Sequence, residues 1–123
     1  MKRVLVVDDS ATMRRMVIAA LTSIGDLAFE QAVSGLDAIE RVTVAPVDLV
    51  LLDINMPDMH GLEVLRFIRG QEAFKSLPVV ILTTRGDDDS RTAALREGAT
   101  LYLTKPFAAS AFVSQLRPLL EAR

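Results

Sequence analysis

The amino-acid sequence predicts an α/β domain whose parallel β-sheet carries helices on both faces. Five short apolar runs, each suited to a β-strand, alternate along the chain with five segments of helical periodicity. Several of these runs are continuous rather than alternating, as expected for strands that are buried on both faces. The chain has 123 residues, and we expect residues 1–123 to form a single domain.

The first strand is predicted at residues 4–7 and stops at Asp8 and Asp9. Ser10 is a suitable N-cap for the helix that follows, and Gly25 is a suitable stop. We expect the apolar residues of this helix to pack in the core. They are Met13, Met16, Val17, Ala20, Leu21 and Ile24.

The second strand, residues 27–32, is interrupted by Glu30 and Gln31. Such a mixed strand suits the edge of a sheet, because charged side chains discourage pairing with other molecules. A short helix is expected from Ser34 to a point before Pro46, which lacks a backbone N–H. The apolar residues of this helix are Leu36, Ala38, Ile39 and Val42.

The third strand, residues 48–53, ends on Asp53. An Asp is a poor strand residue and is costly to bury without a partner, so this position suggests the edge of a pocket. The stretch alone leaves a second interpretation open, in which Asp53 simply begins a loop. Pro57 and Gly61 bracket that loop, and the helix after it has one apolar face. That face consists of Leu62, Leu65 and Ile68.

The fourth strand, residues 79–82, ends on Thr83 and Thr84. The acidic residues 87–89 suit the N-terminus of a helix, where the helix dipole favours negative charge. We expect that helix at about residues 90–97 and expect it to be weakly anchored, because few apolar residues are available for burial. These are Ala93, Ala94 and Leu95.

The fifth strand, residues 101–103, also ends on polar residues, Thr104 and Lys105, which precede Pro106. A last helix follows, and Pro118 is expected to kink it or to interrupt its hydrogen bonding. The apolar residues of this helix are Phe112, Val113, Leu116, Leu119 and Leu120.

Composition and charge exclude several classes of protein. Half of the residues are hydrophobic and 24% are charged, a balance that favours a globular domain over a disordered one. The net charge of -2 comes without a basic stripe, so we expect no direct binding of nucleic acid. The chain has no cysteine, which excludes disulfides and thiol nucleophiles. Without a signal peptide or a membrane-spanning run, we expect a cytoplasmic monomer that makes no membrane contact.

Polar side chains follow four of the predicted strands. In a parallel sheet these strand ends meet at one edge, which is where ligands bind. Three carboxylates close together suit a hard divalent cation such as Mg²⁺ or Mn²⁺, while lysine and hydroxyl groups suit a phosphate. Such a set can stabilise phosphoryl transfer onto a carboxylate. Its members are Asp8, Asp9, Asp53, Thr83, Thr84 and Lys105.

Each of these residues also suits an ordinary structural role. Asp8 and Asp9 suit the N-terminus of a helix, Thr83 could satisfy a backbone group at a strand end, and Lys105 could be a solvated loop residue. The joint placement of such residues after four buried strands is difficult to obtain by chance. We therefore favour a functional site.

The sequence resembles the receiver domain of two-component response regulators over its whole length, most nearly the stand-alone chemotaxis regulators of the CheY kind. The resemblance is carried by VLVVDDS at residues 4–10, LVLLDINMP at 49–57 with Gly61, ILT at 81–83 and KPF at 105–107. It implies five helices and the strand order 2-1-3-4-5, an order taken from flavodoxin-like folds, of which CheY is itself an example.

The resemblance further implies that Asp53 accepts phosphate from the phosphohistidine of a partner histidine kinase. Asp8 and Asp9 would hold Mg²⁺ or Mn²⁺ together with the Asp53 carboxylate and the backbone carbonyl of Asn55. Lys105 would pair with the phosphoryl group. The protein would thus be a signalling module that catalyses its own phosphorylation and dephosphorylation.

The resemblance also implies a conformational switch. Thr83 would move to hydrogen-bond the phosphoryl group, and Tyr102 would follow it inward. This movement would change the surface formed by the fourth helix, the last strand and the last helix, where a downstream protein such as a flagellar switch would bind. The predicted weak anchoring of the fourth helix agrees, because marginally stable segments are the ones that switch. The bond before Pro106 would be cis.

Two positions depart from the family pattern. Thr84 adds bulk where most members have a small residue and where phosphoryl donors enter. Arg85 occupies a position whose side chain influences the rate of phosphate loss. Asn55 occupies another such position, and there the residue matches the chemotaxis regulators. The lifetime of the phosphorylated state therefore stays open, as do the cognate kinase and the output target.

Two other functions are weighed against this one. A phosphohydrolase with an aspartyl-phosphate intermediate would carry a second acid where this chain has Asn55, and its nucleophile would lie on the first strand. A binding scaffold that works without phosphate stays possible because of Thr84. The sequence is compatible both with a stand-alone regulator and with a receiver cut from a larger protein.

Overall fold

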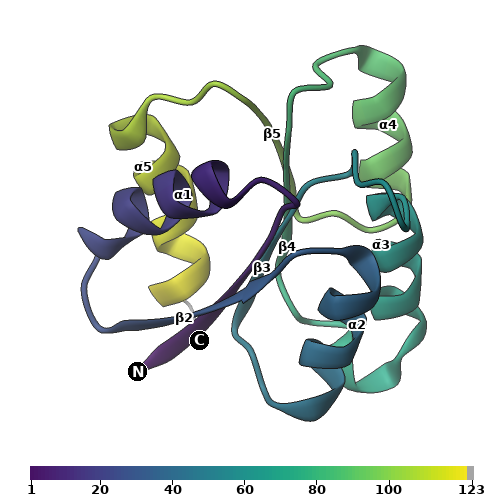
Figure 1. Cartoon of the computed structure of the whole chain (residues 1–123), viewed down its shortest axis with the longest axis horizontal. Helices are drawn as coiled ribbons and strands as arrows, with labels where there is room; N and C mark the ends of the chain where they lie inside the picture. The colour runs from purple at the N-terminus through teal and green to yellow at the C-terminus, as the bar shows by residue number, and fades with distance from the viewer. Residues whose placement is uncertain (122–123) are drawn as a thin grey trace.

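The computed structural model describes residues 1–121, which form a five-stranded parallel sheet between two layers of helices (Figure 1). The strands follow the predicted order β2-β1-β3-β4-β5. Their bounds are Lys2–Val7 for β1, Leu27–Ala32 for β2, Leu49–Leu52 for β3, Val79–Thr83 for β4 and Leu101–Thr104 for β5. The helices are α1 (Ala11–Thr22), α2 (Gly35–Val44), α3 (Gly61–Gly70), α4 (Asp88–Arg96) and α5 (Ala109–Glu121), with a short 3₁₀ helix η1 at Glu72–Phe74.

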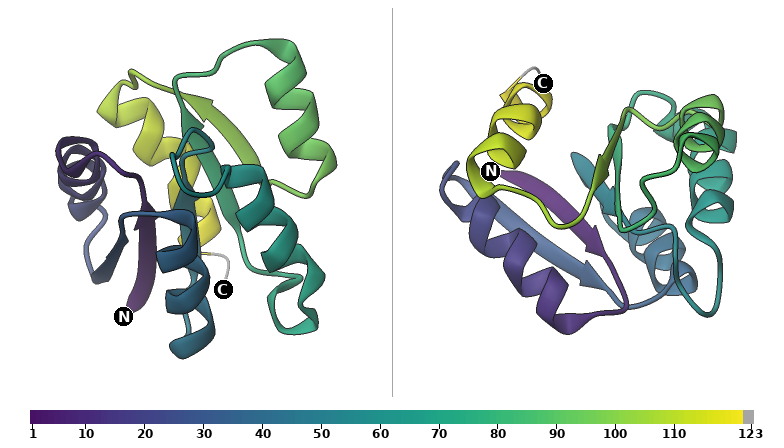
Figure 2. Two further views of the ribbon diagram at one scale, coloured as in Figure 1. Left: turned by 45° about the vertical axis from the view of Figure 1, so that its right-hand side comes forward. Right: turned by 90° about the horizontal axis from the view of Figure 1, so that it is seen from above.

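Each face of the sheet has its own apolar core. Helices α1 and α5 cover one face, and α2, α3 and α4 cover the other (Figures 1 and 2). Strand β1 serves both, because Val4 and Val6 pack towards α1 and α5 while Leu5 and Val7 pack towards the opposite layer. The central strands β3 and β4 are buried at every position, which explains their continuous apolar sequences.

Side-chain caps set several helix boundaries. The predicted N-cap Ser10 accepts a hydrogen bond from the backbone N–H of Met13 at the start of α1. Helix α4 begins two residues earlier than predicted, because Asp87 is its N-cap and accepts a bond from the N–H of Ser90 at 2.9 Å. Helix α5 (Ala109–Glu121) includes Pro118, which has no N–H to donate, so the helix lacks one backbone hydrogen bond there but does not end at the proline.

Two large apolar residues of the helices are exposed, and one of them, Met16, was expected in the core. Met16 and Leu36 are 52% and 62% exposed. Helix α1 instead buries Val17, which lies about 100° further round the helix than Met16. Helix α4 buries only Ala94, and Leu95 is 42% exposed, in agreement with weak anchoring. No helix within residues 1–121 is long and apolar enough to cross a membrane.

Candidate functional site

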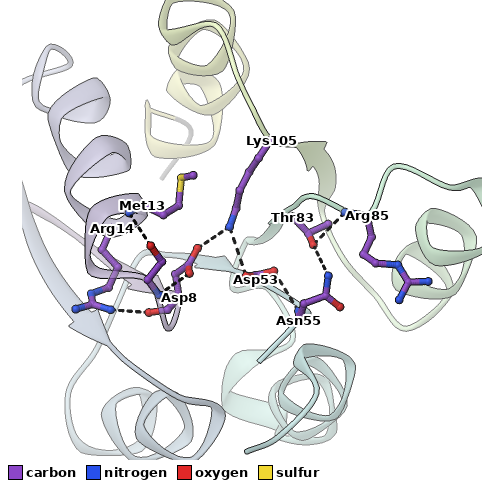
Figure 3. Close-up of polar contacts among 9 residues, drawn as sticks. Asp8, Met13, Arg14, Asp53, Asn55, Thr83, Arg85 and Lys105 are labelled. Carbon is purple, nitrogen blue, oxygen red and sulfur yellow. Dashed lines mark hydrogen bonds and ion pairs between the residues drawn. The ribbon is translucent and has the colours of Figure 1, made fainter. Parts of the chain in front are cut away.

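The site residues lie at the carboxyl ends of the strands, as predicted. Asp8 follows β1, Asp53 follows β3, Thr83 ends β4 and Lys105 comes directly after β5 (Figure 3). The Asp53 N–H donates to the carbonyl of Val7 at 3.0 Å, so the ladder between β1 and β3 continues one residue beyond β3. This continuation fixes the backbone of Asp53 beside that of Asp8.

An acidic cluster forms at this edge. Carboxylate oxygens of Asp8, Asp9 and Asp53 lie within 4.8 Å of one another. Asp8 and Asp53 are only 5% and 7% exposed, whereas Asp9 is exposed. Buried carboxylates are costly unless an opposite charge or hydrogen-bond donors compensate them. The cluster therefore requires a cation close by.

Lys105 supplies a positive charge between the two buried carboxylates. Its Nζ lies 2.7 Å from Asp8 Oδ2 and 3.4 Å from Asp53 Oδ2. The Lys105 side chain is 8% exposed, which keeps solvent from weakening these interactions. The backbone N–H of Lys105 donates to the carbonyl of Thr83 at 2.8 Å, and the bond to Pro106 is cis, as expected.

Backbone groups orient the other carboxylate oxygens. Asp8 Oδ1 accepts a hydrogen bond from the N–H of Ser10 at 2.9 Å. Asp53 Oδ1 accepts one from the N–H of Asn55 at 3.1 Å. Both carboxylates are thus held so that Oδ2 faces Lys105. Such fixed oxygen donors are suited to a divalent cation.

Gly61 allows the loop after Asp53 to pack against the start of α3. A Cβ at this position would lie 2.4 Å from the Cα of Ile54 and 2.6 Å from the carbonyl oxygen of Asp53. The Gly61 N–H donates to the Ile54 carbonyl at 2.9 Å. Gly61, which was expected to bracket the loop, therefore also lets the loop approach the helix closely.

Thr83 and Tyr102 lie on the β4–β5 side of the site. Thr83 is fully buried, and its Oγ1 accepts hydrogen bonds from Asn55 Nδ2 at 3.5 Å and from the Arg85 N–H at 3.4 Å. Tyr102, expected to move inward, is already inward here at 3% exposure, and its hydroxyl donates to the carbonyl of Arg85. Burial raises the pKa of Tyr102, and the negative charge of Asp87 adds to this effect.

The positions that depart from the family pattern lie at the rim. Thr84 and Arg85 are both exposed. The Arg85 guanidinium points towards α4, where its Nε lies 3.4 Å from Asp87 Oδ1. Arg85 therefore links the site to the N-cap of α4.

The sequence analysis missed two polar residues that support the site. Arg14 donates from Nη1 to the Asp8 carbonyl at 2.7 Å (Figure 3). It also donates from Nε to the side chain of Gln31 at 2.8 Å. Asp58 accepts hydrogen bonds from the N–H groups of Gly35 and Leu36, at 3.1 and 3.2 Å. Desolvation by itself would raise the pKa of Asp58, but these backbone bonds lower it overall. No local sequence pattern indicated either contact.

Comparison with known proteins agrees with this arrangement. Residues 4–117 match the response regulator receiver domain. The chain belongs to this family. Its sequence is 34% identical over 119 residues to the chemotaxis protein CheY1 of Helicobacter pylori, covering 96% of each chain. The CheY homolog of Campylobacter jejuni is also 34% identical, over 96% of this chain and 92% of its own.

Solved receiver structures share the fold. The chemotaxis protein CheY4 of Vibrio cholerae superposes with a TM-score of 0.89 at 34% identity, covering 98% of this chain and 99% of that one. The Mn²⁺-bound form of the response regulator Rcp1 gives a TM-score of 0.86 at 30% identity, covering 100% and 97%. The predicted family and strand order are thereby confirmed, and receiver domains are signalling modules.

Proposed function

We propose that this receiver domain accepts a phosphoryl group on Asp53 from the phosphohistidine of a histidine kinase and signals through the resulting change of its surface. One observation carries the proposal. The buried carboxylates of Asp8 and Asp53 converge on Lys105, with Asp9 alongside. This set combines a nucleophile, a cation site and a phosphate-binding ammonium within one edge of the sheet.

The residues of the site divide the chemistry among them. A carboxylate oxygen of Asp53 forms a bond to phosphorus while the bond from phosphorus to the imidazole nitrogen breaks, and the imidazole keeps the electron pair. Asn55 holds the Asp53 carboxylate in place through its N–H. Lys105 moves its charge from the carboxylates to the phosphoryl oxygens. Reaction on a positioned carboxylate requires mainly orientation and charge neutralisation.

The donor set fits Mg²⁺ or Mn²⁺. Asp8, Asp9 and Asp53 offer three carboxylate oxygens close together, and the backbone carbonyl of Asn55 would complete the protein ligands. A bound cation would supply further neutralisation of the phosphoryl oxygens. The similar structure of Mn²⁺-bound Rcp1 supports this assignment.

The signal would pass from Thr83 to the face formed by α4, β5 and α5. Thr83 would exchange its present bonds for one to the phosphoryl group, and Tyr102 would keep the buried position that opens this face to a partner. About two added negative charges are enough to bias such an element. Because the relatives include named chemotaxis proteins, we propose motility control as the output.

Three residues at the rim would set the lifetime of the phosphorylated state. Thr84 and Arg85 are exposed beside the acceptor, and Asn55 lies two residues after it. Smaller or uncharged side chains there would change the access of water to the phosphoryl group. We expect Thr84→Ala to change the rate of phosphate loss, measured after removal of the donor, without changing the fold.

Mass spectrometry after incubation with acetyl phosphate and Mg²⁺ tests the proposal. The wild type should gain one phosphate, and it should gain none when EDTA replaces Mg²⁺. Asp53→Asn should gain none in either case, whereas the matched control Asp26→Asn, at an exposed carboxylate that precedes β2 at the opposite end of the sheet, should still be modified. A wild type that stays unmodified, or an Asp53→Asn variant that is modified, would contradict the proposal.

Two further measurements separate the alternatives. Equal partner affinity of the wild type and of Asp53→Asn in the presence of donor would favour a scaffold that works without phosphate. Multiple-turnover hydrolysis of a phosphomonoester would favour a phosphohydrolase.

A further inference from the structure

We propose that Val33 and Leu36, here called the rim patch, form part of the docking surface for the protein that carries the phosphohistidine. This inference rests on the proposed function. Val33 is 53% exposed and Leu36 is 62% exposed, and both belong to the segment that leads from β2 into α2. Single exposed apolar residues are common on protein surfaces, so it is the position of these two beside the acceptor, more than their exposure, that points to a partner.

The strand register places Val33 in the same row as the acceptor. Within the sheet, Val7 pairs with Ala32 on one side and with Leu52 on the other. The residue that directly follows each strand end is Asp8 after β1, Val33 after β2 and Asp53 after β3. Because neighbouring strands lie about 4.8 Å apart, the backbone of Val33 lies about 10 Å from that of Asp53.

Leu36 is tied to the acceptor loop itself. The N–H groups of Gly35 and Leu36 donate to the carboxylate of Asp58, which lies on the loop that follows Asp53. The two segments approach closely, since a Cβ on Gly35 would lie 2.7 Å from the Cβ of Met59. The rim patch is therefore held in a fixed position relative to Asp53.

A protein donor has to cover this patch, whereas a small donor does not. Asp53 is only 7% exposed, so a phosphohistidine reaches it only when its protein presses against the edge of the sheet. A standard interface buries about 800 Å² on each partner, which corresponds to a disc of about 16 Å radius. Such a disc centred on Asp53 includes Val33.

The surroundings of the patch define the chemistry of the partner. An exposed acidic residue borders it, Asp58 on the acceptor loop, whose carboxylate accepts a hydrogen bond from the N–H of Leu36. The partner should therefore present apolar side chains beside its phosphohistidine and basic side chains further out. The apolar contacts would supply affinity, and the charges would orient the partner and speed association.

A comparison of two phosphoryl donors tests the inference. The double variant Val33→Thr, Leu36→Gln keeps side chains of similar size and leaves the backbone bonds in place. Histidine kinases of the source organism are first autophosphorylated with ATP. The kinase that then transfers phosphate fastest to the wild type serves as the protein donor. We expect kcat/KM for this transfer to fall by about tenfold because KM rises, which is the effect of losing a moderate interface contact. Phosphorylation by acetyl phosphate should be unchanged.

Val44→Gln is the matched control. Val44 is 76% exposed and ends the same helix α2, far from the carboxyl ends of the strands. Its substitution removes an exposed apolar side chain without touching the rim patch. We expect transfer from the kinase to this variant at the rate of the wild type.

Four outcomes would overturn the inference. In the first, the double variant accepts phosphate from the kinase as fast as the wild type. In the second, both donors are slowed alike, which would mean that the substitutions disturb the site. In the third, the variants change only self-association in sedimentation experiments, which would assign the patch to a second copy of the chain. In the fourth, acetyl phosphate modifies the wild type but no kinase does. If neither donor modifies the wild type, the proposed function itself fails.

Discussion

Helices α3 and α4 lie on the same face of the sheet, and each follows a loop that comes from the site, but they are anchored in different ways. Helix α3 buries Gly61, Val64, Leu65 and Ile68 against the core. Helix α4 buries only Ala94. Its ends are held by polar contacts instead, with Asp87 capping its N-terminus and Arg69 of α3 binding the carbonyl of Gly98 just beyond its C-terminus.

This difference assigns different roles to the two helices. The apolar side chains of α3 stay buried only while the helix keeps its position on the sheet. Helix α3 therefore holds the acceptor loop in one place. Single hydrogen bonds contribute only about 1 kcal/mol each and are readily exchanged for others. In the proposed switch, α4 is therefore the helix that would shift in response to Thr83, while α3 would keep Asp53 in position.

The largest contrast is expected from removing a leucine from each helix. Leu65 of α3 is fully buried, so Leu65→Ala should lower the free energy of unfolding by about 2–5 kcal/mol. Leu95 of α4 is 42% exposed, and Leu95→Ala should cost less than about 1 kcal/mol. Urea denaturation followed by circular dichroism measures both values. Similar losses from the two substitutions would contradict the difference in anchoring.

The glycines near the N-termini of the two helices provide the next comparison. In Gly61→Ala the new Cβ would meet the Asp53 carbonyl, and we expect a loss of about 1–3 kcal/mol together with slower phosphorylation by acetyl phosphate. A Cβ on Gly86, before α4, would meet only the Thr104 methyl group at 3.4 Å. Gly86→Ala should leave stability within about 0.5 kcal/mol of the wild type. A tolerated Gly61→Ala would show that the acceptor loop is not rigidly seated.

Arg69 provides a smaller and more local effect. Its guanidinium donates to the carbonyls of Gly98 and Phe74, both at 2.9 Å, and to Thr100 Oγ1 at 3.4 Å. We expect Arg69→Ala to cost about 1–2 kcal/mol and to speed hydrogen exchange at residues 96–100, since these bonds hold the end of α4. Arg66→Ala removes only the surface ion pair with Glu97 and should cost less than about 1 kcal/mol. Equal exchange in the two variants would argue against the anchoring role of Arg69.

The smallest effect is the pH dependence of the α4 N-cap. Hydrogen bonds from the side chain and backbone of Ser90 lower the pKa of Asp87 from 3.8 to about 2. Because the unfolded chain binds this proton more readily, the contribution of the cap is complete above pH 3.8 and is lost as the pH falls towards 2. Carbon-13 NMR titration of the Asp87 carboxyl should show the lowered midpoint. A midpoint near 3.8 would contradict the capping role.

An Asp87→Asn variant tests the same cap without a titrating group. Asn is as good an N-cap as Asp, so α4 should still form from the same residue. The amide shifts of Ser90 should no longer follow pH between 2 and 3.8. Helix α3, which begins at Gly61 after the N-cap His60, has no carboxylate as its N-cap and should show no comparable change in either protein.

Much of the fold could be predicted because its signals are local. The continuous aliphatic run of β3 and the N-cap Ser10 each lie within a few residues of the element that they define. The exposure of Met16 and Leu36 could not be predicted, since apolar residues lie on more than one side of α1 and α2 and only packing shows which side is buried. The contacts of Arg14 and Asp58 were missed because their partners come from other elements.

The sequence by itself determined the type and order of the elements and placed a polar residue at the end of four strands, because periodicity, caps and breakers act over short stretches of chain. Only the tertiary structure decided that Lys105 meets Asp8, 97 residues earlier, and that Asp53 lies between Val7 and Gly61. Such contacts depend on strand order and on how the helices pack across the sheet. Both are set by the burial of the two apolar cores together, and not by any single segment.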